Sequence, residues 1–323
     1  MDREFQFVKH ATAVVFLCAV APTIASAQAA PPRPAPPAAY SVGAAYDSAR
    51  ARLVVFGGFL GGRYVGDTWE WDGAAWTKNE QPGPSARNSP ALVYDEKRGR
   101  VLMFGGDARP VGDLGDTWER VGDKWRQIVG AGPTPRTTHV MVYDSRRDRV
   151  VLFGGVAGGE GLGDTWEFDG EHWTRVATAG PSPRGLYAMT FDSRRGKTVL
   201  FGGTSAPRPD SPSLGDTWEW DGRRWTRVDV TGPSARDHTQ MVYDPVRRVV
   251  VLHGGGLDQA ATETWTYDGR AWTRESFTGP SRRYAKMVFD TRGKAVQLYG
   301  GFAEQPSNEL WQLGPAAWRR VAP

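Results

Sequence analysis

The sequence predicts an all-β protein, a six-bladed β-propeller made of four-stranded antiparallel blades. Three observations carry this prediction. An apolar run that ends in a pair of glycines occurs six times along the chain. Each run precedes a segment centred on Trp, written Gly-Asp-Thr-Trp-Glu in four of the six copies. The copies recur every 46 to 52 residues, and self-similarity at a period of this length is typical of propeller blades.

Each copy contains four short segments that favour β-strands. The first ends at an aromatic residue and leads into a turn of the Asp-Ser-Arg-Arg kind, and the second is the apolar run before the glycines. The third carries Thr-Trp-Glu, and an Asp-Gly turn joins it to a fourth that opens with Trp. Asp-Gly between two strand-like runs favours a tight hairpin, because these residues tolerate positive φ. The aromatic residues that end the first strands are Tyr46, Tyr94, Tyr143, Phe191, Tyr243 and Phe289.

A single sheet of this size cannot bury both of its faces, whereas six sheets packed radially share one core and leave no long free edge. We expect the first blade to begin near Ser41 and the last to end near Val321. The repeat phase then gives six whole blades, so blades six and one should close the ring by face packing without sharing a strand. All 14 Trp fall in register with the repeat, and we expect them to pack between blades.

The N-terminal region differs from the repeats. Residues 1–27 combine a charged start, an apolar run and Ala25-Ser26-Ala27, which predicts a cleaved signal peptide and a secreted or periplasmic protein. Residues 28–39 are rich in Pro and Ala and read as an extended linker, and residues 40–323 form the propeller. Cys18 is the only cysteine and lies in the predicted signal, so no disulfide or thiolate ligand is expected after cleavage. We expect no membrane span in the mature chain.

The repeat resembles the kelch repeat family. The resemblance rests on the glycine pair after an apolar strand, two Trp seven residues apart, and a Pro-x-x-Arg lead-in to the next copy, and it covers about residues 36–321. It implies a propeller but leaves function open, because kelch propellers include both enzymes and binding modules. Galactose oxidase is similar in its repeats, but its copper site needs a Tyr cross-linked to Cys, so that chemistry is not expected here.

Two repeated charged positions are expected to tie neighbouring blades together. The Arg position holds Arg87, Arg136, Arg184, Arg236 and Arg282, with Ala39 in blade one. The carboxylate position holds Asp67, Asp116, Asp164, Asp216, Glu263 and Glu309. An anion site built from several of these Arg is the alternative. The net charge of +4 is spread along the repeats rather than gathered in one run, so no nucleic-acid partner is expected.

Function is expected on the face that carries the connections between second and third strands, because their lengths vary from blade to blade. Candidate residues in these loops are Arg63, Tyr64, Arg208 and Asp210. The residues just before each first strand do not repeat either and should surround the mouth of the central channel. Among them the candidate ligand-binding residues are Asn88, His139, Tyr187, Asp237, His238, Arg283 and Tyr284. Rings and polar groups together suit a sugar or another polar ligand, and an ordinary hydrated channel mouth is the alternative.

These observations favour an extracytoplasmic binding or interaction module that presents its variable face to a polar ligand, a glycan or a protein partner. No residue is assigned as catalytic, and no cofactor or metal is expected. A site formed by His139, His238 and Asp237 is a possible exception, since two His and one carboxylate can hold a transition metal. The alternative function is a carbohydrate-active enzyme of the sialic acid mutarotase or epimerase kind, with Asp237 or Glu160 in acid–base chemistry and Arg283 holding a carboxylate.

Overall fold

The computed structural model describes residues 34–205, 211–256 and 262–322, and these residues form one compact unit of strands and turns. Six four-stranded antiparallel sheets each use four consecutive long strands. No helix among the described residues is long and apolar enough to cross a membrane. The predicted signal peptide lies outside the described residues.

The strands of the six blades are as follows. Blade one contains β1 (Gly43–Asp47), β2 (Arg52–Phe56), β5 (Thr68–Trp71) and β6 (Trp76–Asn79), and blade two contains β7 (Ala91–Asp95), β8 (Arg100–Phe104), β9 (Thr117–Val121) and β10 (Lys124–Ile128). Blade three contains β11 (Val140–Asp144), β12 (Arg149–Ala157), β13 (Glu160–Phe168) and β14 (Trp173–Ala177), and blade four contains β15 (Ala188–Asp192), β16 (Lys197–Phe201), β17 (Thr217–Trp220) and β18 (Trp225–Val228). Blade five contains β19 (Gln240–Asp244), β20 (Val249–His253), β21 (Glu263–Tyr267) and β22 (Trp272–Thr278), and blade six contains β23 (Lys286–Asp290), β24 (Ala295–Tyr299), β25 (Leu310–Leu313) and β26 (Trp318–Ala322).

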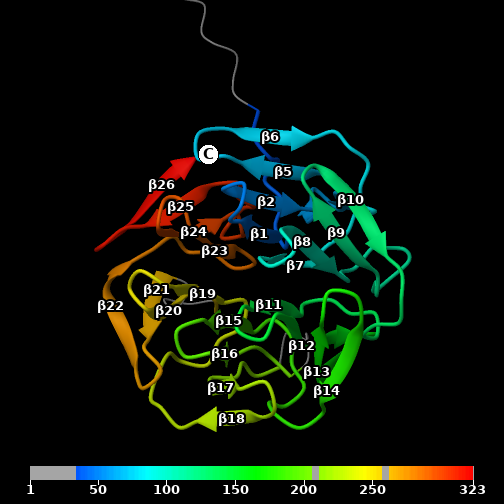
Figure 1. Cartoon of the computed structure of the whole chain (residues 1–323). Coiled ribbons are helices and arrows are strands. Elements are labelled where there is room, and N and C mark those ends of the chain that lie inside the picture. Colours follow the sequence, from blue (N-terminus) through cyan, green and yellow to red (C-terminus); the bar gives the residue numbers. More distant parts are fainter. Residues whose placement is uncertain (1–33, 206–210, 257–261, 323) are drawn as a thin grey trace, which may run out of the picture. The chain divides into compact units, whose positions relative to one another are not determined.

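The blades form a closed ring with the first strand of each blade nearest the centre (Figure 1). The innermost strands contact one another in the order β1, β7, β11, β15, β19, β23, and β23 contacts β1 again. Blades six and one therefore meet face to face, and each is built from its own four strands. The predicted all-β propeller and its closure without a shared strand are both confirmed.

Trp side chains join each blade to the one before it, as the repeat predicts. The Trp that opens each fourth strand packs on the residue before the glycine pair of the preceding blade, with ring centroids 4.8 to 5.6 Å apart. His253 occupies this packing position in blade five and lies against Trp318. Five of these Trp also donate Nε1 to a Thr of the preceding blade at 2.9 to 3.0 Å. In blade one the corresponding Nε1, that of Trp76, has no hydrogen-bond partner, because blade six carries Leu310 where the other blades carry Thr.

The repeated Arg also connects neighbouring blades. The backbone of Arg184 bonds to blade three through Leu162 O and Gly155 N, both at 2.9 Å. Its guanidinium forms two hydrogen bonds, of 2.6 and 2.9 Å, to Asp216 of blade four. The Trp two residues after the carboxylate donates to it as well, as Trp218 does to Asp216 at 2.7 Å. Arg87 and Arg136 form the same two-bond pairs, Arg236 and Arg282 pair with Glu263 and Glu309, and blade one, with Ala39, has no counterpart.

The glycine pairs allow the backbone of one blade to approach the next. Both glycines of each pair adopt positive φ, as in Gly105 at 66° and Gly106 at 102°. A Cβ atom on Gly105 would lie 2.6 Å from the carbonyl oxygen of Arg136. Other residues are therefore disfavoured by both conformation and space.

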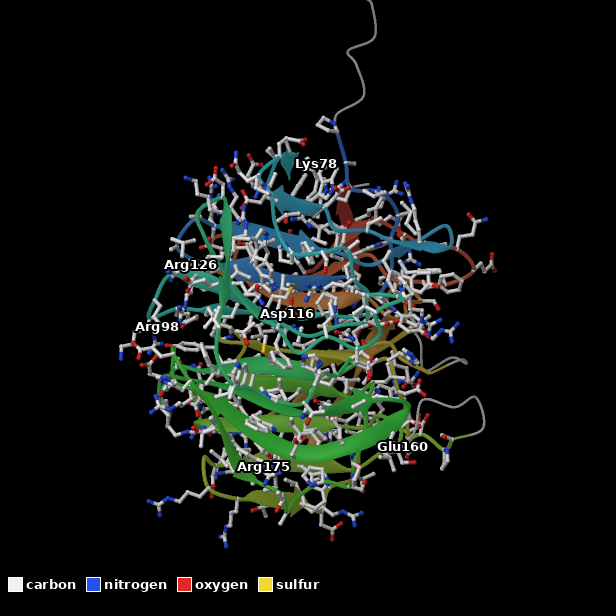
Figure 2. The ribbon with its side chains drawn as sticks, turned by 90° about the vertical axis from the view of Figure 1, so that its right-hand side faces the viewer. Lys78, Arg98, Asp116, Arg126, Glu160 and Arg175 are labelled. Carbon is white, nitrogen blue, oxygen red and sulfur yellow. The ribbon has the colours of Figure 1, made fainter. Side chains whose placement is uncertain are left out.

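The two ends of the ring differ. We call the end that carries the connections between second and third strands the loop face, and the end that carries the two short turns of each blade the turn face. Figure 2 shows Glu160, at the start of β13, and Arg98, in a short turn, on opposite sides. The loop of blade one forms a small hairpin from β3 (Phe59–Leu60) and β4 (Arg63–Tyr64), and in blade three β12 and β13 extend into a ribbon on the loop face. The sequence predicted the loops but not these two hairpins.

Candidate binding site at the channel mouth

The mouth of the channel is built where the lead-in to each first strand meets the residue after a glycine pair. Isolated β-bridges join these two positions in five blades: Tyr40 to Phe59, Asn88 to Asp107, Thr137 to Val156, Gly185 to Thr204, and Arg283 to Phe302. In blade five, Gly256 donates its backbone N–H to Asp237 at 3.0 Å. The repeat therefore fixes the backbone of the mouth, while its side chains differ in every blade.

Immediately below lies a ring of six residues with left-handed backbone. These are Ser41, Ser89, Thr138, Leu186, His238 and Tyr284, with φ between 52° and 59°. Left-handed backbone is unfavourable for residues other than glycine, and most of all for a β-branched residue such as Thr138. Backbone hydrogen bonds link members of the ring, including Ser89 N to Ser41 O at 2.8 Å and His238 N to Leu186 O at 2.8 Å. This ring could not be predicted from the sequence, because none of its members is glycine.

An aromatic cluster fills one side of the mouth. Its centre is Tyr40, whose ring lies 5.3 to 5.5 Å from those of Phe59, Tyr284 and Phe302. The His238 ring packs edge-on against Tyr284 at 4.1 Å. We call these five residues the mouth cluster. Phe59 and Phe302 were not predicted, although each is an aromatic residue directly after a glycine pair, which is the signal that could have found them.

Charged groups border the mouth cluster. His238 Nδ1 lies 2.6 Å from Asp237 Oδ1, and Ser213 donates its hydroxyl to the other carboxylate oxygen at 3.3 Å. Burial acts to raise the pKa of Asp237, but the bonds from His238 and Ser213 and the charge of Arg283 outweigh it and lower that pKa. Asp237 is therefore ionised at neutral pH. Arg283 lies over the Tyr284 and Phe302 rings at 6.0 Å, and no carboxylate of the described residues forms an ion pair with it.

The structure brings four of the predicted rim residues together: Asp237, His238, Arg283 and Tyr284. Asn88 lies across the mouth, where Tyr64 donates its hydroxyl to Asp107. Burial and the Asp107 carboxylate raise the pKa of Tyr64 to about 12. Arg63 is exposed on the blade-one hairpin. Arg208 and Asp210 lie outside the described residues.

His139 and Tyr187 lie deeper than predicted. They are 3% and 2% exposed and belong to the wall between blades rather than to the open rim. The Tyr187 hydroxyl donates to the carbonyl of Phe153 and accepts the N–H of Val140, so its bonding is internal to the fold. Each residue directly follows a member of the left-handed ring. The left-handed backbone changes the direction of the chain at that point, so the next side chain points into the interface between blades.

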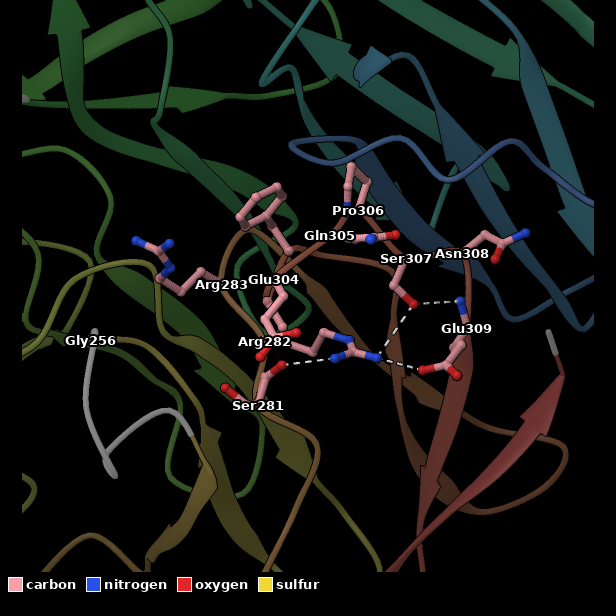
Figure 3. A pocket seen from close by; sticks show the side chains of 12 residues that line it. Gly256, Ser281, Arg282, Arg283, Glu304, Gln305, Pro306, Ser307, Asn308 and Glu309 are labelled. Atoms are coloured by element: carbon pink, nitrogen blue, oxygen red, sulfur yellow. Dashed lines mark hydrogen bonds and ion pairs between the residues drawn. The ribbon is translucent and has the colours of Figure 1, made fainter. Parts of the chain in front are cut away.

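A pocket of about 700 Å³ opens on the loop face between blades five and six. Arg282 and Glu309 cross it as an ion pair of 2.5 Å, and Arg282 also bonds to the carbonyl of Ser281 at 2.9 Å. In Figure 3, Arg283 points away from this pair toward the other side of the pocket. Phe302 and Arg283 line the pocket and also adjoin the mouth, so the two recesses share a wall.

Comparison with known protein families identifies the family of this chain. The model described as the KLHDC2/KLHL20/DRC7 Kelch-repeats domain matches residues 67–221 and 117–279, which together span more than half of the chain. The chain belongs to the kelch-repeat family. No curated protein matches it. Kelch propellers are typical protein-interaction modules, so the family supports a binding role without identifying the partner.

Within this kelch propeller, the geometry does not support the metal site considered from the sequence. His139 is enclosed in the blade interface, whereas His238 and Asp237 lie at the mouth. Across the ranges that the structure describes, no three His, Cys, Asp or Glu side chains converge to hold a metal ion. Among the described residues, the mouth offers a set of rings, the ionised Asp237 carboxylate, and Arg283 without a carboxylate ion pair. This set suits recognition of a polar ligand.

Proposed function

We propose that this kelch propeller is an extracytoplasmic binding module that holds a polar partner, a protein or a glycan, at the channel mouth. The observation that carries the proposal is the environment of the Arg283 guanidinium. Its guanidinium lies over two aromatic rings, between the mouth cluster and the 700 Å³ pocket, without a paired carboxylate among the described residues. Arg on an aromatic platform can bind an acidic group while the rings contact its apolar surroundings. A secreted or periplasmic location is part of the proposal, and the signal-like sequence of residues 1–27 supports it.

Binding is tested by variants that change the mouth and leave the scaffold alone. Arg283→Met and Tyr40→Ala should weaken capture of envelope or secreted partners and should abolish thermal stabilisation by any sugar acid that stabilises the unmodified protein. The control is Arg223→Met, because Arg223 is exposed in a short turn on the turn face. Equal binding by all three variants would overturn the proposed location.

A second function is favoured by one specific contact, the 2.6 Å pair of His238 and Asp237 beside Arg283. A carboxylate that orients an imidazole, with an Arg nearby to hold an acidic sugar, is an arrangement suited to proton transfer. The enzyme hypothesis is a mutarotase or epimerase acting on such a sugar. It predicts anomer exchange, observed by NMR, that Asp237→Asn and Arg283→Met both abolish without lowering the unfolding temperature. Exchange at the uncatalysed rate with the unmodified protein would exclude it.

A further inference from the structure

A second feature lies inside the channel, below the mouth. The first residue of the innermost strand is small, apolar or neutral in five blades and is a lysine in the sixth. In blade order these residues are Gly43, Ala91, Val140, Ala188, Gln240 and Lys286. The channel wall therefore carries one ammonium group at a level where the other blades contribute no charge.

Two small cavities meet at Lys286. The lower has a volume of about 90 Å³ and the upper about 50 Å³, and both are also lined by His139, Tyr187 and Gln240. The upper cavity is bounded by all six members of the left-handed ring. Spaces of this size hold a few water-sized groups and exclude a sugar or a peptide. Each cavity therefore suits only small species.

The Lys286 ammonium has no counter-charge among the described residues around it. No Asp or Glu lines either cavity, and no described residue forms an ion pair with Lys286. The other titratable side chains facing the cavities are His139, Tyr187, His238 and Tyr284. Burial lowers the pKa of Lys286 to about 8, so the group is still mostly protonated at neutral pH. Lys286 is half-buried, so its ammonium is accessible from the channel, and a partly desolvated charge without a partner is unfavourable.

Two further polar groups in the wall are unsatisfied. Neither ring nitrogen of His139 makes a hydrogen bond of good geometry, although the Phe104 and Thr137 carbonyls lie close to the ring, and the buried hydroxyl of Thr138 has no partner. His139 is 3% exposed, and burial lowers its pKa to about 3 despite the opposing effect of the Phe104 and Thr137 carbonyls. It is therefore neutral and can donate one N–H. Buried polar groups without partners point to a bound species that satisfies them.

We propose that the channel binds a small monovalent anion of the size of chloride or bromide at Lys286, beside His139 and Gln240. The ammonium supplies the charge, and the neutral imidazole and the amide supply N–H donors. This site lies below the mouth, and two members of the left-handed ring, His238 and Tyr284, border both the upper cavity and the mouth cluster. Its role is to neutralise the one unpaired cation of the channel wall and so to stabilise the closed ring.

The test uses the purified protein with bromide as the probe. Crystals grown in sodium bromide should show an anomalous peak within about 3.5 Å of Lys286 Nζ. A well-ordered channel that contains water only, with no anomalous peak, would overturn the proposal.

Solution measurements provide a second readout. Raising sodium bromide at constant ionic strength, with gluconate as the balancing anion, should raise the unfolding temperature of the unmodified protein, because gluconate is too large for the cavities. Lys286→Met and Lys286→Gln should remove this response, and Lys124→Met, which changes an exposed lysine on β10, should keep it. If the Lys286 variants respond to bromide as the unmodified protein does, the site is elsewhere and the proposal fails.

Discussion

Tyr46 donates its hydroxyl to Asp290 Oδ1 at 2.5 Å across 244 positions of sequence, which joins the first blade to the last. Burial and the Asp290 carboxylate raise the pKa of Tyr46, so the hydroxyl stays protonated and remains a donor. Asp290 also accepts the backbone N–H groups of Arg292 and Gly293 and the Gln297 amide. This contact matters for closure because blade one lacks the Arg that joins the other blades, having Ala39 there.

We expect Tyr46→Phe to lower the free energy of unfolding by about 1.5–3 kcal/mol, the range for a hydrogen bond to a charged group. Urea denaturation measures this loss. Tyr143→Phe is the matched control, because Tyr143 bonds at 3.0 Å to Asp148 of its own blade. Equal effects of the two substitutions would show that the bond between blades one and six has no special part in closure.

Breaking one buried Arg–carboxylate pair should be far more damaging than breaking an exposed one. Arg184→Met leaves Asp216 without its two guanidinium bonds, and we expect a loss of about 3–5 kcal/mol. Lys78→Met breaks the exposed pair with Asp67 of blade one, and solvent screening makes the expected loss far smaller. Thermal and urea unfolding distinguish these values, and similar losses would contradict a role of the buried pair in joining blades.

The unpaired indole of blade one predicts an asymmetry between two equivalent tryptophans. Trp225→Phe removes the bond to Thr165 and leaves a buried hydroxyl without its donor. Trp76→Phe removes an Nε1 that has no partner. Loss of ring area is common to both, so we expect Trp225→Phe to cost about 1–2 kcal/mol more. The ordering of the two unfolding free energies checks this, and the reverse order would refute it.

Two buried histidines predict sensitivity to acid. Burial lowers the pKa of His139 to about 3 and that of His253 to about 4, from an ordinary value near 6.5. The unfolded chain therefore binds more protons, so their contribution to stability is complete above pH 6.5 and is lost as pH falls toward 4 and 3. At pH 4.5 each should account for about 2–3 kcal/mol of lost stability.

His139→Leu should flatten the decline in unfolding free energy between pH 7 and pH 4.5, whatever its effect at pH 7. Replacing the exposed His172 with Ala should leave the slope unchanged. An unchanged slope in His139→Leu would show that another group causes the acid sensitivity.

The lowered pKa of Lys286 predicts that the free energy of unfolding changes with pH in the alkaline range. Its pKa is lowered from 10.5 to about 8, so without a bound anion the unfolded state holds the extra proton between these values. Stability should therefore rise as pH increases from 8 to 10.5, by on the order of 3 kcal/mol. The difference between the unmodified protein and Lys286→Met isolates this contribution, and bromide should reduce it. A difference that does not vary with pH would contradict the assignment.

The amino-acid sequence by itself determined the number of blades, the order of their strands and the structural use of most repeated residues. This was possible because each blade repeats one local pattern, and a pattern present six times reports on the scaffold rather than on one site. The role of Arg184 in joining two blades followed from its repeated position alone.

Only the tertiary structure decided which residues that do not repeat lie together. Tyr40 and Phe302 are far apart in the chain and meet because the ring closes between blades six and one. Likewise, the depth of His139 and Tyr187 depends on the left-handed residue before each of them, which no residue type indicates. Lys286 lacks a charged partner because of the residues that the five other innermost strands place around the channel. The residues next to Lys286 in the sequence do not predict that arrangement.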